Sequence, residues 1–148
     1  MKHFLGILAI LFATAMTHAQ FTGSNGVPAY HPVAPAAGTK LSPILTEKQL
    51  ADAGLIAPAQ KESYKAAARA SSVLYQMPCY CYCDRNHGHS SLRSCFESTH
   101  GASCGTCMTE ALYTYRQSKR GWSPKMIRDG IMRGDFKMID LENVPPIN

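Results

Sequence analysis

All six cysteines of this chain lie in its middle, between Cys79 and Cys107. The first three alternate with two tyrosines in the run Pro-Cys-Tyr-Cys-Tyr-Cys at residues 78–83. The last two form the pattern Cys104-Gly-Thr-Cys107, and Cys95 lies between the two motifs. Clustered thiolates can bind a soft metal ion or exchange electrons as a dithiol and disulfide pair. The sequence therefore predicts one thiol centre rather than scattered structural bridges.

The spacing of the first motif sets a condition on its shape. In an extended chain, the α-carbons of Cys79 and Cys83 would lie about 13 Å apart, which is too far to share one ion. Binding of one ion by all three cysteines therefore requires the segment to curl, as a loop after a helix that stops at Pro78 can do. A disulfide within a Cys-x-Cys pair would instead close a small ring at the edge of allowed geometry and would be easy to reduce.

The second motif is placed at a predicted helix start. Residues three apart lie on one face of a helix, and the helix dipole favours a thiolate at the more N-terminal Cys104. Such a pair can clip a metal ion or cycle between dithiol and disulfide. The residue after Cys107 is Met108 and not histidine, so no c-type haem is expected.

Neutral imidazoles near the cysteines could complete a mixed sulfur and nitrogen site. The leading hypothesis is an exported protein that binds Cu(I) or Zn(II) for buffering, delivery or sensing. The predicted metal ligands are Cys79, Cys81, Cys83, Cys95, Cys104 and Cys107, with His87, His89 and His100 as additional donors.

Two alternatives remain open. In a thiol-disulfide redox protein, Cys104 would attack, Cys107 would resolve, and the alternating triad would pass electrons to a partner protein. Such a chain would be a thiol-disulfide oxidoreductase, although no thioredoxin-like strand-helix-strand pattern is present, and a binding protein is favoured over an enzyme. In the other alternative all six cysteines form structural disulfides, but three cysteines at alternate positions can staple little that is not already adjacent.

Helix signals predict the elements that position these residues. Capping residues, prolines at first helical positions and terminal glycines delimit five short helices: between Thr46 and Gly54, from Pro58 to the stop at Pro78, between Ser90 and Gly101, between Ser103 and Gly121, and between Ser123 and Gly134. The second should be the longest. No alternating strand pattern appears. We therefore expect an all-α fold, a small helical bundle with a cysteine-rich loop, over residues 45–139.

The ends of the chain carry different signals. Residues 1–19 have the charge, apolar run and small final residues of a secretory signal peptide, and that run is too short for a permanent membrane span. Export to the periplasm or the extracellular space is expected, with no stable membrane span after cleavage. Residues 20–44, rich in Pro, Gly and Ala, predict a flexible, disordered linker, and residues 140–148 predict an irregular tail.

The charge of the chain is mildly basic. Fifteen Lys and Arg residues stand against ten Asp and Glu residues, giving a formal net charge of +5, of which Lys2 contributes one within the predicted signal. Exported proteins rarely meet nucleic acid, so a solvated basic surface is the expected interpretation. The expected partner is a metal ion or a redox protein, and not a nucleic acid.

Several elements of residues 74–131 occur in an order that resembles a known family. They are Pro78–Asp84, Gly88–Leu92, Cys95-Phe96, His100-Gly101, Cys104, Cys107 and Ile127-Arg128. Together they resemble the bacterial exported family named for a PCYCGC or CYCXC motif. The resemblance implies no mechanism, but some members look like selenoproteins, which implies a reactive chalcogen. Many members look like lipoproteins, whereas this sequence lacks a lipid-attachment cysteine, and Tyr82 stands where the motif has glycine.

Overall fold

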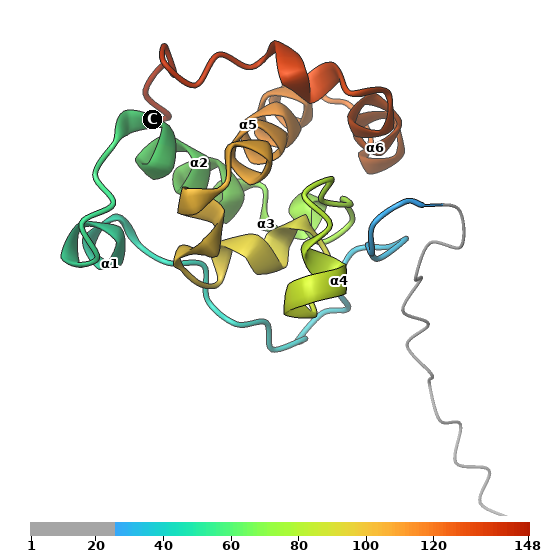
Figure 1. The fold of residues 1–148 in the computed structure, drawn as a ribbon. Helices are drawn as coiled ribbons and strands as arrows, with labels where there is room; N and C mark the ends of the chain where they lie inside the picture. Colours follow the sequence, from blue (N-terminus) through green and yellow to red (C-terminus); the bar gives the residue numbers. More distant parts are fainter. Residues whose placement is uncertain (1–25) are drawn as a thin grey trace, which may run out of the picture.

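The computed structural model describes residues 26–148. Within them the fold is helical, with six α-helices, three 3-10 helices and no β-strand, so the predicted all-α class is confirmed (Figure 1). The elements are α1 Glu47–Asp52, α2 Pro58–Arg69, α3 Ser71–Leu74, α4 Cys83–His87, η1 Leu92–Phe96, η2 Thr99–Ser103, α5 Gly105–Lys119, α6 Pro124–Arg133 and η3 Asp135–Met138. The predicted signal peptide, residues 1–19, lies outside the described residues, as does the beginning of the predicted linker.

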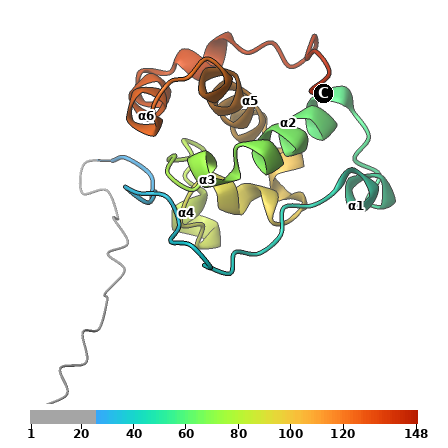
Figure 2. The ribbon, with the colours of Figure 1, turned by 180° about the vertical axis from the view of Figure 1, so that it is seen from behind.

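Helices α2 and α5 form the centre of the fold. They lie side by side in both views, with α6 and η3 beyond α5 and with α1 at the opposite end (Figures 1 and 2). The shared core includes Tyr64 and Ala67 from α2 and Ala111 from α5. The tail that follows η3 returns to α2, where the Ile147 N–H donates to Glu62 Oε2 at 2.6 Å. The first turn of α5 lies in the interior, where Cys107 is fully buried.

Most helix starts follow the predicted capping chemistry. Thr46 and Gln49 form the capping box of α1, and Pro58 occupies the first turn of α2. The Ser123 hydroxyl accepts from the Met126 N–H at the start of α6, which ends at Gly134 in a left-handed conformation. These local signals act within one turn of the chain, which is why the sequence identifies them.

The predicted long helix from Pro58 to Pro78 is wrong. The chain leaves helical geometry at Ala70, with φ −108° and ψ 25°, so that α2 and the short α3 are separate and α5 is the longest helix. A tertiary contact lies at the break, because the buried Arg93 side chain donates from Nε to the Ser71 hydroxyl at 2.8 Å. A contact with a residue so distant in sequence cannot be inferred from helical periodicity.

The predicted α-helix between Ser90 and Gly101 is also wrong. The segment instead contains two 3-10 helices, η1 and η2, separated by a bend. Leu92 and Cys95 are three apart and both fully buried, and this spacing suits a three-residue turn as well as an α-helix. Gly101 does not end a helix but lies within η2, buried.

Residues 26–44, which belong to the segment predicted as a linker, contain no helix or strand and contact the helical domain. The Ala29 N–H donates to Asp84 Oδ2 at 3.0 Å, and Arg93 Nη2 donates to the Ser42 carbonyl at 2.7 Å. Residues 140–148 likewise contain no helix. Among the described helices, none combines the length and the apolar character that crossing a membrane requires.

Candidate metal centre

The motif at residues 78–83 curls instead of extending. Tyr82 adopts a left-handed conformation, with φ 57° and ψ 35°, and α4 begins at the next residue. This turn brings the sulfurs of the three motif cysteines to one side of the loop. Five sulfurs then lie within 4.8 Å of one another, those of Cys79, Cys81, Cys83, Cys95 and Cys107.

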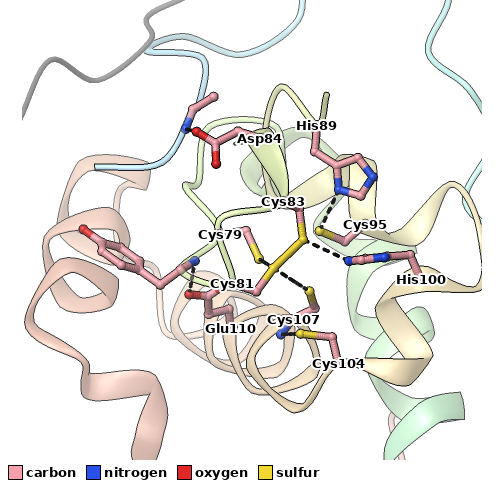
Figure 3. Close-up of a disulfide and its surroundings, with 12 residues drawn as sticks. Cys79, Cys81, Cys83, Asp84, His89, Cys95, His100, Cys104, Cys107 and Glu110 are labelled. Carbon is pink, nitrogen blue, oxygen red and sulfur yellow. Dashed lines mark hydrogen bonds between the residues drawn. A yellow bond between two sulfur atoms is a disulfide. The ribbon is translucent and has the colours of Figure 1, made fainter. Parts of the chain in front are cut away.

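The two cysteine motifs meet through Cys107, which lies in the first turn of α5. Its sulfur is 3.5 Å from that of Cys79 and 3.4 Å from that of Cys81 (Figure 3). The Cys79 and Cys81 sulfurs are 3.1 Å apart. Residues from the loop and from α5 therefore converge in one buried sulfur cluster.

One disulfide is present among these sulfurs. It joins Cys81 to Cys83, and the other four cysteines are free. Since a disulfide sulfur carries no proton, any proton in the contacts with Cys81 can come only from Cys79 or Cys107. This arrangement differs from the alternative in which all six cysteines form three structural disulfides.

A second group of donor atoms overlaps the first. Cys83 Sγ lies 2.9 Å from His100 Nε2, and Cys95 Sγ lies 3.3 Å from His89 Nδ1. The four donor atoms of these residues lie within 4.8 Å of one another. His87 belongs to neither group. Its side chain is exposed, with its ring centroid 4.6 Å from that of His100.

The close packing of η1 and η2 places His100. A Cβ atom at residue 101 would stand 2.8 Å from the Cys95 carbonyl oxygen, so only glycine fits there. The Ser98 hydroxyl caps η2 by accepting from the His100 N–H at 3.3 Å. Gly101 thus allows the imidazole to reach the sulfurs of Cys83 and Cys95.

Cys104 lies beside the cluster but in neither donor group. It is the N-cap residue of α5, and its half-buried sulfur accepts from the Cys107 N–H at 3.5 Å. Hydrogen bonding to the Cys107 side chain, and then to the Cys107 and Thr106 backbone, lowers the pKa of Cys104 to about 6. At neutral pH Cys104 is therefore a thiolate at a helix start, as the helix-dipole argument predicts.

The buried thiols differ in pKa. Hydrogen bonds from Cys107 and Cys95 lower the pKa of Cys79, whereas hydrogen bonds to Cys104 and Cys79 raise the pKa of Cys107. Burial, and then the neighbouring His100, lower the pKa of His89, which is thus a neutral imidazole with a free lone pair. The region thus stabilises one negative sulfur, that of Cys79, and offers an uncharged nitrogen donor, that of His89, beside it.

Glu110 supports the cysteine loop and is not among the site residues predicted from the sequence. It is fully buried on α5, one turn after Cys107, and its Oε1 accepts from the Tyr80 N–H at 2.9 Å. Burial, and then the charge of Cys79, raise the pKa of Glu110 well above its ordinary range. The available signal was an acidic residue three positions after Cys107, on the face that also carries Ala111.

A cleft among the described residues is separate from this cluster. It has a volume of about 590 Å³ and is lined by residues of α5, α6, η3 and the tail, together with Tyr80. None of its lining residues is a cysteine or a histidine. The sulfurs of Cys79, Cys83, Cys95 and Cys107 are instead buried, and the remaining donors of the two groups are partly buried beside them.

The comparisons with known proteins agree with the resemblance noted above. The family model described as a protein of unknown function with PCYCGC motif matches residues 54–137, more than half of the chain. The match includes both cysteine motifs, the three histidines and Glu110. No curated protein and no solved structure gives a significant match.

Proposed function

We propose that this chain, which belongs to the PCYCGC-motif family, binds a soft or borderline transition metal ion, Cu(I) or Zn(II), through its clustered cysteines. The observation that carries the proposal is the convergence of five sulfurs from the loop, η1 and α5 within 4.8 Å. Soft thiolate ligands select such ions over Mg²⁺ or Ca²⁺. The role would be to buffer, deliver or sense the ion outside the cytoplasm.

The sulfur spacing suits coordination. A Zn–S bond is about 2.3 Å, so two thiolates on one tetrahedral ion stand about 3.8 Å apart. The Cys79–Cys107 and Cys81–Cys107 sulfur distances of 3.5 and 3.4 Å need only small adjustments to reach that value. A cation would also compensate the charge of several thiolates that could not otherwise ionise together in the core.

Metal binding requires reduced cysteines. Cys81 and Cys83 must leave their disulfide to act as thiolate ligands, so oxidation and metal binding compete for the same sulfurs. Protons compete as well, because a bound thiolate must be deprotonated. The proposed metal-binding form is therefore the reduced chain at neutral or higher pH.

The test is retention of metal by the reduced protein. The purified chain is reduced with a phosphine under anaerobic conditions, loaded with Zn(II) or Cu(I), desalted and analysed for metal per chain. We expect at least one ion per chain and a loss of affinity of at least about tenfold for Cys95→Ser, which removes a sulfur common to both donor groups. Cys104→Ser is the matched control, because Cys104 belongs to neither donor group. No retained metal, or equal losses in the two variants, would refute the proposal.

A redox function is the second candidate, and one observation favours it. The free thiols of Cys79 and Cys107 lie 3.1 and 3.4 Å from Cys81, a member of the disulfide. If the Cys79 thiolate attacks Cys81 Sγ, a Cys79–Cys81 bond forms, the Cys81–Cys83 bond breaks and Cys83 leaves as a thiolate. This exchange consumes no external electrons. It would involve Cys79 rather than the predicted attacking residue Cys104.

Equilibration with glutathione separates the redox function from metal binding. A metal-free chain that exchanges two electrons reversibly at a potential within the range of oxidoreductases would support the redox function. If the disulfide stays intact across that range, and the chain binds metal once it is reduced chemically, metal binding is supported and the redox function is not.

A further inference from the structure

Two donor groups, and not one, surround Cys83 and Cys95. The first contains these two sulfurs together with those of Cys79, Cys81 and Cys107. The second contains the same two sulfurs together with nitrogens of His89 and His100. The shared sulfurs thus stand at the junction of a sulfur-only side and a mixed sulfur and nitrogen side.

The number of donors exceeds what one ion can use. The two groups together offer five sulfurs and two imidazole nitrogens. A Zn(II) site in a protein takes about four ligands. One ion would therefore leave three donors without a ligand role, whereas two ions that share two sulfurs can each reach four ligands.

We infer that the centre holds two divalent ions bridged by the sulfurs of Cys83 and Cys95. One ion is bound by the two bridging sulfurs, His89 and His100. The other is bound by the bridging sulfurs and two of the three remaining sulfurs of the first group. The inference rests on the proposed metal-binding function and names the composition of that centre.

The positions of the two histidines support the bridged arrangement. Each bridging sulfur has an imidazole nitrogen close by, at 2.9 Å for Cys83 and His100 and at 3.3 Å for Cys95 and His89. Figure 3 shows Cys83 between the imidazole rings and Cys79. A sulfur approached from two sides can bind one ion on each side.

Charge favours divalent ions for this pair. The four ligand thiolates carry four negative charges, and neutral imidazoles add none. Two Zn(II) ions supply four positive charges and leave the centre neutral, whereas two Cu(I) ions would leave two negative charges in the core. Because an uncompensated charge is costly to bury, the smaller residual charge is preferred, which indicates Zn(II).

Zn(II) stoichiometry tests the inference on the purified, reduced chain. Native mass spectrometry and metal analysis should give two Zn(II) ions for the unchanged chain and one for the His89→Ala/His100→Ala double variant. His87→Ala is the matched control and should keep two, because this exposed histidine belongs to neither group. The X-ray absorption spectrum of the unchanged chain should also contain a zinc–zinc scattering path, a result that does not depend on any variant folding.

The outcomes separate the inference from the proposed function. No bound Zn(II) or Cu(I) would overturn both. One Zn(II) ion in the unchanged chain, without a zinc–zinc path, would overturn the two-ion centre and leave metal binding standing. Two ions that persist in the double histidine variant would also overturn it, because the second ion would then lie elsewhere.

Discussion

The sulfur of Cys83 lies 2.9 Å from Nε2 of His100, a residue seventeen positions away in the chain. The contact joins the start of α4 to η2, and it requires both the left-handed turn at Tyr82 and the close approach at Gly101. Neither feature is a ligand, yet together they bring the loop and the histidine to one place. The candidate centre therefore depends on backbone geometry as much as on its donor atoms.

The left-handed conformation of Tyr82 predicts an unusual preference for glycine over alanine. The motif of the family has glycine at this position, and glycine adopts positive φ without the steric cost that other residues incur. Tyr82→Gly should be more stable than Tyr82→Ala by about 1 kcal/mol, as measured by urea unfolding. Both variants lose the ring contacts with Tyr80 and Arg85, so the difference isolates the backbone. Alanine being the more stable variant would mean that the turn is not left-handed.

Cys104 should be the fastest-reacting free thiol of the chain with its disulfide intact. Its pKa is lowered to about 6, so below this pH the group is a protonated thiol and above it a nucleophilic thiolate. Its alkylation rate by iodoacetamide should rise with pH to a plateau, with a midpoint near pH 6, followed by peptide mass mapping. The buried Cys79, Cys95 and Cys107 should react only after unfolding. A midpoint at the ordinary thiol pKa, or faster labelling of a buried cysteine, would contradict this assignment.

The buried hydroxyl of Tyr64 should make the folded protein less stable at alkaline pH. Its hydroxyl donates to the Ser98 carbonyl at 2.5 Å and accepts from the Ala102 N–H at 3.2 Å, and burial raises its pKa from 10.0 to about 12. A raised pKa keeps the proton on the folded state. The stability that the Tyr64 hydroxyl contributes is therefore complete below pH 10. It falls by up to about 1.4 kcal/mol per pH unit between pH 10 and 12.

Comparison with Tyr64→Phe isolates this effect. The variant leaves the Ser98 carbonyl and the Ala102 N–H without their partner, at a cost of about 1 to 3 kcal/mol at neutral pH. Its deficit relative to the unchanged chain should shrink as pH rises from 10 to 12. A deficit that stays constant over this interval would show that the hydroxyl ionises normally in the folded state.

Glu110 should act as a neutral anchor for the cysteine loop. Glu110→Gln keeps an oxygen that can accept from the Tyr80 N–H, whereas Glu110→Ala leaves that donor unpaired beside a cavity. We expect Glu110→Ala to lower the free energy of unfolding by about 2 to 4 kcal/mol and Glu110→Gln to have a much smaller effect.

The pH dependence of the same pair supplies a second check. Because the carboxyl pKa is raised by burial, the unchanged chain loses stability as pH rises above the ordinary glutamate value of 4.5, and the glutamine variant does not. The free energy of unfolding of Glu110→Gln should therefore increase relative to that of the unchanged chain as pH rises. Equal destabilisation by both substitutions, independent of pH, would indicate that the charged carboxylate is needed.

Local signals in the sequence predicted the helical class and the starts of α1, α2 and α6, since caps and first-turn prolines act within a few residues. The break at Ala70 depends on tertiary packing that includes the Arg93 contact with Ser71, and so lies beyond any periodic pattern. The 3-10 geometry of η1 was missed because residues three apart share a face in both kinds of helix.

The candidate site also combines features that the sequence predicts with features that depend on tertiary packing. The clustering of cysteines in sequence identified the centre, and the need for the loop to curl followed from the reach of an extended chain. The sequence could not separate Cys104 from Cys107, although one lies at the N-cap and the other in the cluster. Nor could it separate exposed His87 from His89 and His100, because that depends on how η2 packs against η1.

The most direct test of the central claim is the first coordination shell of the metal. X-ray absorption of the reduced chain loaded with Zn(II) should give a shell dominated by sulfur at about 2.3 Å, with a smaller nitrogen contribution. In the proposed centre, cysteines of the loop, η1 and α5 together supply this sulfur. A shell of oxygen and nitrogen alone, or zinc lost on desalting, would contradict the account.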